Sequence, residues 1–311
     1  MLSDLLLIVL GVVMVLWGAD RLTEGASALA RRMRVPEIVI GLTIVAAGTS
    51  APELFVSLVS ALKDTPDMAV GNVVGSNIFN TLLIVGCAAM VAPMVIAPST
   101  VKKDIPFAVG ASMLLPAVIL MGNDVSRSDG FVLLAFFALF MVYTFRVALQ
   151  KGNGENASVV APVNVWKSLL YVVAGLGGLI IGSNLFVDSA SDVARQLDIS
   201  EGVIGLTIVA GGTSLPELAT SVVAARKGQS AIAIGNVIGS NVFNILLILG
   251  LTATVSPMAV QGITVVDLSV MLVSILMVWA FSYTKYTVAR WEGAVLTLAF
   301  MAYMGWLFYN L

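Results

Sequence analysis

The chain has 311 residues and a formal net charge of −2, and 59% of its residues are hydrophobic whereas only 11% are charged. Soluble domains carry about 25% charged residues, so most of this surface is expected to face lipid, as the mean hydropathy of +1.01 also indicates. The chain has no histidine and one cysteine, Cys87, which excludes Ser-His and Cys-His nucleophiles and an intrachain disulfide. No basic tract indicates a nucleic-acid partner. We therefore expect a multi-pass protein of the cell membrane that is not an enzyme.

Apolar stretches long enough to cross a bilayer, roughly 20 residues each, recur along the whole chain. They predict ten transmembrane helices, at about residues 3–30, 36–62, 67–92, 103–121, 128–149, 167–194, 201–225, 230–256, 265–283 and 289–309. The first stretch has neither the preceding basic residue nor the clear cleavage site of a signal peptide, so it counts as a span. The expected fold class is an all-α membrane protein.

A polar, Gly- and Asn-containing segment at residues 150–166 divides the chain into residues 1–149 and 167–311. It predicts a linker between two halves. Lys and Arg gather on the cytoplasmic side of membrane proteins, and ten helices with the N-terminus outside place thirteen of these residues inside and three outside. We therefore predict that both termini lie outside and that the linker is cytoplasmic.

An internal repeat relates the two halves. Residues 36–94 align with residues 200–258 at a constant offset of 164 without a gap, and about 36 of the 59 aligned positions are identical. Each copy belongs to five predicted helices, and because five is odd the second copy enters the membrane from the opposite side. The sequence therefore predicts two inverted five-helix repeats, an architecture in which transporters place their site near the bilayer midplane.

The motif GTS-x-PE occurs at residues 48–53 and again at 212–217, each time midway along an apolar segment. Proline lacks an N–H and clashes with the carbonyl four residues back, so each motif should break its helix and free backbone carbonyls. Irregular backbone at this depth is tolerated where protein buries it or where it lines a cavity. Freed carbonyls and hydroxyls are hard oxygen ligands, which suit sodium and calcium rather than soft metals. The expected carbonyls are those of Gly48 and Gly212 and, near them, Ala46, Thr49, Ala210 and Thr213.

Glu53 and Glu217 end the two motifs. A charge at the bilayer centre costs about 2.5–3.5 kcal/mol on insertion scales, so such residues are expected to serve a function. The repeat predicts that the two glutamates face each other across the pseudo-two-fold axis. Calcium prefers six to eight oxygens, which two carboxylates and several carbonyls can supply. The alternative is a pair of protonated glutamates that serves only helix packing.

A second repeated block, GNVVGSNIFN at 71–80 and GNVIGSNVFN at 235–244, places polar side chains in apolar helices. Its Ser and its last Asn are four residues apart, so they share one helix face. We favour cation coordination for this face over simple interhelical hydrogen bonding. The four residues concerned are Ser76, Asn80, Ser240 and Asn244. Asn77 and Asn241 point elsewhere and are expected only to cap or join helices. For Asn72 and Asn236 an interhelical hydrogen bond and a functional role are equally expected.

The paired GTS-x-PE and GSN-x-x-N blocks resemble the signature of the calcium/cation antiporter superfamily, in its prokaryotic sodium/calcium exchanger branch. The resemblance covers essentially the whole chain. It implies that Glu53 and Glu217 bind calcium and share the sodium sites, and that the first and sixth helices slide over a rigid eight-helix core during alternating access. It also implies a wider ligand set: the hydroxyls and carbonyls of Thr49, Ser50, Thr213 and Ser214, the backbone of Ala46 and Ala210, and the side chains of Ser76, Asn80 and Ser240.

One position departs from this pattern. Some exchangers of the family, including potassium-coupled ones, carry aspartate where this chain has Asn244. Two carboxylates therefore remain, and they balance one calcium ion or two sodium ions. The asparagine argues against potassium coupling.

The leading functional prediction is exchange of sodium for calcium, with both ions competing for the same two glutamates. The main alternative is antiport of calcium, or of another divalent cation, against protons, because buried carboxylates can carry protons. An ion channel would use the same oxygen ligands, but the inverted repeat favours a transporter. The expected partners are sodium ions, calcium ions and the lipid bilayer, with no cofactor and no obligatory protein partner.

Overall fold

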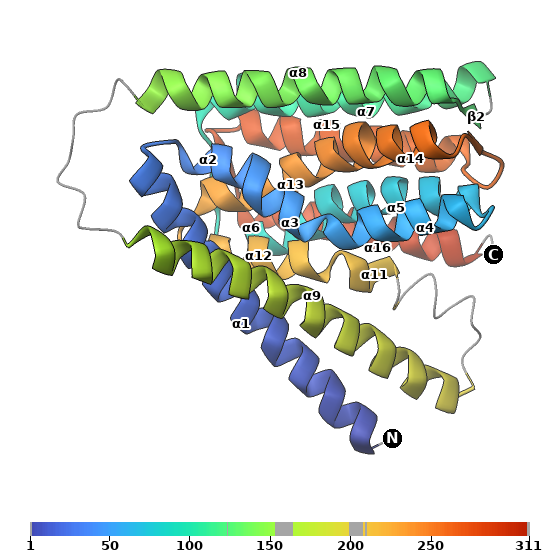
Figure 1. Cartoon of the computed structure of the whole chain (residues 1–311), viewed down its shortest axis with the longest axis horizontal. Coiled ribbons are helices and arrows are strands. Elements are labelled where there is room, and N and C mark those ends of the chain that lie inside the picture. Colours follow the sequence, from blue (N-terminus) through green and yellow to red (C-terminus); the bar gives the residue numbers. More distant parts are fainter. Residues whose placement is uncertain (1, 123, 153–163, 199–207, 209, 310–311) are drawn as a thin grey trace.

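The computed structural model describes residues 2–122, 124–152, 164–198, 208 and 210–309. These residues are almost entirely helical (Figure 1), which confirms the all-α class. The described part also contains four two-residue strands, β1 (Met94–Val95), β2 (Asp124–Val125), β3 (Met258–Ala259) and β4 (Thr287–Val288). They form two antiparallel pairs, β1 with β4 and β2 with β3, which join connections from different halves of the chain.

The helices include several short π-helical stretches, labelled η. In chain order the described helices are α1 (Leu2–Met33), α2 (Glu37–Ile40), η1 (Gly41–Val45), α3 (Ala46–Thr49), α4 (Ala51–Leu62), α5 (Pro66–Ile78), η2 (Phe79–Ile84), α6 (Val85–Val91), η3 (Thr100–Asp104), α7 (Ile105–Gly122), α8 (Arg127–Gly152), α9 (Val165–Gln196), α11 (Ala210–Thr213), α12 (Leu215–Arg226), α13 (Ser230–Val242), η5 (Phe243–Leu249), α14 (Gly250–Val255), α15 (Val265–Tyr283) and α16 (Arg290–Tyr309).

Seven helices among the described residues are long and apolar enough to cross a membrane. An eighth span results if the bent pair Glu37–Thr49 and Ala51–Leu62 is counted as one. Each of the ten predicted segments contains helix, but the segment at 201–225 lies partly outside the described residues. The count of ten spans and the division of the chain at residues 150–166 therefore stay predictions.

The ends of the chain lie toward one end of the bundle. In Figure 1 α1 begins and α16 ends toward the right of the view, whereas α8 ends and α9 begins at the left. This arrangement is what an even number of crossings requires. Which end of the bundle faces the cell exterior stays a prediction.

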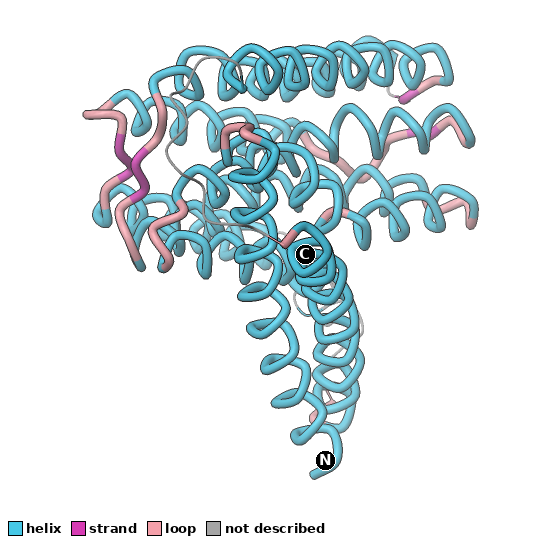
Figure 2. Tube along the Cα trace, turned by 60° about the vertical axis from the view of Figure 1, so that its left-hand side comes forward, coloured by secondary structure: helices cyan, strands magenta, loops and turns pink. Residues whose placement is uncertain are grey.

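Helices α1 and α9 run antiparallel in close backbone contact. A Cβ atom added to Gly18 would lie 2.7 Å from the carbonyl oxygen of Gly175, and one added to Gly11 would lie 2.7 Å from that of Gly182. Small residues at such contacts let helix backbones approach in membranes. Figure 2 shows these two helices side by side. They project from the rest of the bundle, and the N-terminal end of α1 lies at the far end of the projection.

The interior of the bundle is built from the repeat-related helices Pro66–Val91 and Ser230–Val255, which are the most buried of the candidate spans. Both contain a π-helical stretch, η2 and η5, which begins at the last two residues of the second repeated motif. Wide π turns interrupt the regular hydrogen-bond ladder and occur often at functional sites. The polar block therefore lies at the centre of the molecule, remote from lipid.

Both predicted helix breaks are present. Ser50 (φ −82°, ψ 7°) separates α3 from α4, and the segments Glu37–Thr49 and Ala51–Leu62 are bent by 46°. Ser214 (φ −91°, ψ 7°) separates α11 from α12 with nearly the same backbone angles. Each break falls two residues before the proline, so Pro52 and Pro216 occupy the first turn of the following helix, where a missing N–H leaves no hydrogen bond unmade.

Candidate ion-binding site

The two helix breaks exchange hydrogen bonds across the repeat. The Ser50 hydroxyl donates to Oε1 of Glu217 at 3.0 Å, and the Ser214 hydroxyl donates to Oε1 of Glu53 at 3.1 Å. Both glutamates are 1% exposed. The residue at each break thus orients the carboxylate of the opposite repeat, and the structure brings the two predicted glutamates into one buried network.

Two serines of the second motif extend this network. Ser76 accepts a hydrogen bond from the Ser214 hydroxyl at 3.4 Å, and the Ser240 hydroxyl donates to Oε1 of Glu217 at 3.5 Å. Both serines are buried. The structure therefore brings the Ser240 hydroxyl of α13 directly to the Glu217 carboxylate of α12, and it links the Ser76 hydroxyl of α5 to the same network through Ser214.

The asparagines pair between the repeats. Asn80 in η2 donates its amide N–H to Oδ1 of Asn241 at 3.1 Å, and Asn244 in η5 donates to Oδ1 of Asn77 at 3.2 Å. These bonds fix the orientation of both amide groups. Asn77 and Asn241 join helices, as expected, and because they accept from the amide N–H groups they turn the oxygens of Asn80 and Asn244 away from themselves.

Four oxygens of the predicted ligand set have no hydrogen-bond donor among the described residues. All four are fully buried side-chain acceptors: Glu53 Oε2, Glu217 Oε2, Asn80 Oδ1 and Asn244 Oδ1. Buried polar atoms in proteins almost always have a partner, and an unpaired buried carboxylate oxygen is costly. A set of acceptors that lacks donors is complementary to a cation.

Two of the six backbone carbonyls expected as ligands have hydrogen-bond donors within the protein. The Gly212 carbonyl accepts the Ser183 hydroxyl of α9 at 2.5 Å. The Ala46 carbonyl keeps its helical hydrogen bond from the Ser50 N–H at 2.9 Å and also accepts the Thr49 hydroxyl at 3.4 Å. Both carbonyls therefore have protein donors: Gly212 accepts a hydroxyl from another helix, and Ala46 keeps its helical donor and gains a second one.

The remaining candidates lie at the ends of the two short helices before the breaks. Thr49 is buried and its hydroxyl donates to Oδ1 of Asn236 at 3.0 Å. Thr213 is half-buried at the end of α11, and Ala210 begins that helix.

A layer of interhelical hydrogen bonds supports the two carboxylates. The Asn72 amide donates to the Glu53 carbonyl at 3.2 Å and to the Ser57 hydroxyl at 2.9 Å. Asn236 repeats this pattern with the Glu217 carbonyl at 3.3 Å and with Ser221 at 3.0 Å. These bonds anchor the first turns of α4 and α12, which carry the carboxylates. The signal was present, because both the asparagines and the serines obey the offset of 164.

The charge of the site is small. The described residues contain no group of three or more His, Cys, Asp or Glu side chains that could hold a metal ion. The network instead combines two carboxylates with amides and hydroxyls. Ionised, it carries −2, which one divalent or two monovalent cations neutralise.

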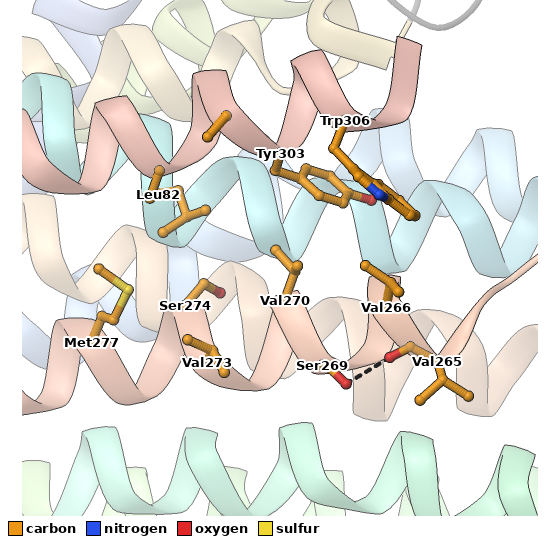
Figure 3. Close-up of a pocket in the computed structure, with 12 residues that line it drawn as sticks. Leu82, Val265, Val266, Ser269, Val270, Val273, Ser274, Met277, Tyr303 and Trp306 are labelled. Carbon is orange, nitrogen blue, oxygen red and sulfur yellow. Dashed lines mark hydrogen bonds between the residues drawn. The ribbon is translucent and has the colours of Figure 1, made fainter. Parts of the chain in front are cut away.

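A separate groove of about 470 Å³ lies along α15 and α16 (Figure 3). Its lining is mainly apolar, with Leu82 of η2 on one side and Trp306 at one end, and it includes no carboxylate. The nearby Asp267 accepts the Tyr303 hydroxyl at 2.7 Å. This groove therefore has none of the features of the ion-binding network.

A bundle of apolar helices in two repeat-related halves, with a buried site of oxygen atoms between them, has the construction of a secondary cation transporter. The comparison with protein families agrees with this class. The chain belongs to the sodium/calcium exchanger protein family, whose model matches residues 3–146 and 167–309.

Curated relatives match nearly the whole chain. The putative antiporter CaxA of Alkalimonas amylolytica is 37% identical over 99% of this chain and 99% of its own length. The inner membrane protein YrbG of Escherichia coli is 36% identical, covering 99% and 98%. The sodium/calcium exchanger MaX1 of Methanosarcina acetivorans is 35% identical, covering 98% and 99%.

Solved structures show the same fold. The sodium-calcium exchanger NCX_Mj, soaked with Na⁺ and Ca²⁺, matches with a TM-score of 0.85 and 30% identity over 97% of this chain and 98% of that one. The protein is therefore a multi-pass membrane antiporter for cations and not an enzyme.

Proposed function

We propose that this antiporter exchanges sodium for calcium by alternating access, with Glu53 and Glu217 as ligands shared by both ions. The observation that carries the proposal is the set of four buried acceptor oxygens without donors, two from these carboxylates and two from Asn80 and Asn244. A calcium ion takes six to eight oxygens at about 2.3–2.6 Å, so other ligands are needed. We assign this supplementary role to Thr49, Ser50, Thr213, Ser214, Ser76, Ser240 and the backbone of Ala46 and Ala210.

Competition between the ions follows from the charge. Two carboxylates balance one calcium ion or two sodium ions, and a further cation would add uncompensated charge in a site where charge is expensive. The amide of Asn244 adds an oxygen without adding charge. Loading of sodium therefore displaces calcium, and the reverse, which is the coupling that an exchanger needs.

Related proteins support the choice of ions. MaX1 is named a sodium/calcium exchanger, and NCX_Mj was soaked with Na⁺ together with Ca²⁺ or Sr²⁺. Both match this chain over almost its whole length. As part of the same proposal, ten helices cross the membrane, both termini lie outside, and the linker at 150–166 is cytoplasmic.

The test is uptake of radioactive calcium into sodium-loaded proteoliposomes. Uptake should require an outward sodium gradient and should be abolished by Glu53→Gln and by Glu217→Gln. Glu292→Gln is the matched control, because Glu292 is also 1% exposed but its partner among the described residues is the backbone N–H of Ala289 at the start of α16. Calcium uptake that ignores the sodium gradient would end this proposal.

One feature favours a second candidate, antiport of calcium or another divalent cation against protons. Among the described residues neither Glu53 nor Glu217 has a Lys or Arg partner, and buried carboxylates of this kind can take up protons. A pH gradient imposed without sodium distinguishes the two. Calcium uptake driven by that gradient alone would replace sodium with protons as the coupled ion.

A further inference from the structure

Lys227, which follows α12, binds one turn of α1. The Nζ atom of Lys227 lies 2.6 Å from Oδ1 of Asp20. The same ammonium donates to the Asp20 carbonyl at 2.9 Å and to the Thr23 hydroxyl at 3.0 Å. The Lys227 and Asp20 side chains are 29% and 36% exposed. All three donors of one ammonium are thus used on a single turn of α1, which makes this contact more specific than an ordinary surface ion pair.

Arg21, next to Asp20 on α1, connects the same cluster to α9. Arg21 pairs with Asp20 and, at 3.1 Å, with Glu24. Its guanidinium carbon lies 5.0 Å from the ring centre of Tyr171 on α9, within the range of a cation–π interaction. The cluster therefore ties the α1–α9 pair to α12.

The repeat shows that this contact has no counterpart at the other end of the molecule. The offset of 164 relates Lys227 to Lys63, but it relates Asp20 to Asn184 and Thr23 to Val187. The lysine is repeated, whereas its carboxylate and hydroxyl partners are not. In agreement, no ion pair to Lys63 exists among the described residues.

The two halves of α1 are also unequally buried, and the more buried half is the one that Lys227 contacts. Its second half is buried, with Ala19, Leu22 and Ala26 fully covered, whereas Leu6 and Val9 in its first half are 64% and 60% exposed. Figure 1 shows α12 running from α11 toward the end of the bundle where α9 begins. Helix α1 is therefore docked at that end, here called the latch end, and diverges from the bundle at the other.

We propose that Asp20 and Lys227 form a one-sided latch that holds the latch end closed and so sets the resting conformation of the antiporter. Under the proposed alternating access, the repeat relates α1 at one end of the bundle to α9 at the other, so two equal halves would populate the two closed states equally. An ion pair present in only one of them shifts this balance. The inference rests on the proposed exchange function for its kinetic test.

The size of the effect follows from partly exposed ion pairs, which shift an equilibrium by about two- to fivefold. When a site is open to one face for only part of the time, its apparent affinity from that face equals the intrinsic affinity multiplied by the open fraction. Lys227→Met should therefore lower the half-saturating calcium concentration at the latch face by about two- to fivefold. At the opposite face the change should be smaller, because the conformation that is open to that face is already the more populated one.

The measurement is calcium half-saturation at each face of oriented proteoliposomes. Orientation is scored with an impermeant thiol reagent on a cysteine added after Leu311, in a Cys87→Ser background. Lys63→Met is the matched control and should leave the ratio between the faces unchanged. Asn184→Asp, which supplies a carboxylate at the repeat position of Asp20, should act in the opposite direction and raise half-saturation at the opposite face. Lys227→Arg should preserve the wild-type ratio.

A second readout does not depend on transport. Spin labels on Arg31→Cys of α1 and Arg226→Cys of α12, again in the Cys87→Ser background, report the closure of the latch end as a distance distribution. Lys227→Met should broaden this distribution and Lys63→Met should not.

An equal change at both faces, or an unchanged distribution in Lys227→Met, overturns the latch. If the wild type shows no sodium-driven uptake, the proposed function fails, and the spin-label distances still decide the latch.

Discussion

Ser50 donates a hydrogen bond to the Glu217 carboxylate, which lies 167 positions later in the chain and on the opposite repeat. The reciprocal bond runs from Ser214 to Glu53. Each helix break therefore positions the acid of the other half, and neither half of the molecule could form the site alone. This reciprocity gives a structural reason for a repeated sequence whose site lies between the two copies.

Loss of one such hydroxyl should weaken calcium binding without removing a charge. Hydrogen bonds to charged groups are worth about 1.5–3 kcal/mol, so Ser50→Ala and Ser214→Ala should each raise half-saturating calcium by about tenfold or more. Calcium-dependent exchange in proteoliposomes measures this. Ser269→Ala is the control, because its hydroxyl donates only to the Val265 carbonyl within α15. Equal effects in all three variants would contradict the role of the exchanged bonds.

Loss of Asn77 or Asn241 should weaken calcium binding less than loss of the asparagine that each one orients, Asn244 or Asn80. Asn77→Ala removes the acceptor that holds the Asn244 amide, so Asn244 becomes free to rotate its oxygen out of the site. We expect a rise in half-saturating calcium for Asn77→Ala, and a larger rise for Asn244→Ala, which removes the oxygen itself. The pair Asn241→Ala and Asn80→Ala should reproduce this order because the repeat duplicates the contact. A stronger effect of Asn77→Ala than of Asn244→Ala would show that the pairing serves helix packing.

Cation binding should stabilise the folded protein, because an ion bound only to the native state adds free energy by mass action. At a concentration of 100 times Kd this amounts to about 2.7 kcal/mol. Calcium should therefore raise the thermal unfolding midpoint of the detergent-solubilised wild type and leave that of the Glu53→Gln, Glu217→Gln double variant unchanged. An equal rise in the double variant would place the stabilising cation elsewhere.

The contact between α1 and α9 should not tolerate a side chain at its glycines. A Cβ on Gly18 would lie 2.7 Å from both a carbonyl oxygen and a backbone nitrogen of α9. Overpacking costs about 1–3 kcal/mol, so Gly18→Ala should lower the thermal unfolding midpoint. Gly177→Ala on α9 is the control, since a Cβ there meets nothing within 4 Å. Unchanged stability of Gly18→Ala would mean that the two helices can separate readily.

Helix class, the repeat and the main candidate acids could be predicted from the sequence, because each depends on local or internal patterns. Long apolar runs predict helices in a bilayer whatever their neighbours are. The offset of 164 pointed to Glu53 and Glu217 as partners, and proline chemistry predicted the breaks at Ser50 and Ser214 within two residues.

Other features depended on contacts between distant residues. The carbonyl of Gly212 was expected to be free, but Ser183 of α9 satisfies it. The π-helical stretches η2 and η5 carry no recognised sequence signal, and they place Asn80 and Asn244. The cross-repeat pairs of Asn77 and Asn241 likewise exist only once two helices from different halves have packed together.

The sequence by itself determined that this chain is a helical membrane protein with two related halves and two acids at equivalent positions, because hydrophobic periodicity and repetition are written along one dimension. Only the tertiary structure decided which oxygens lack donors and that Lys227, unlike its repeat partner Lys63, binds a carboxylate. Both are properties of hydrogen bonding between segments remote in the chain, and they exist only when packing excludes water and brings those segments together.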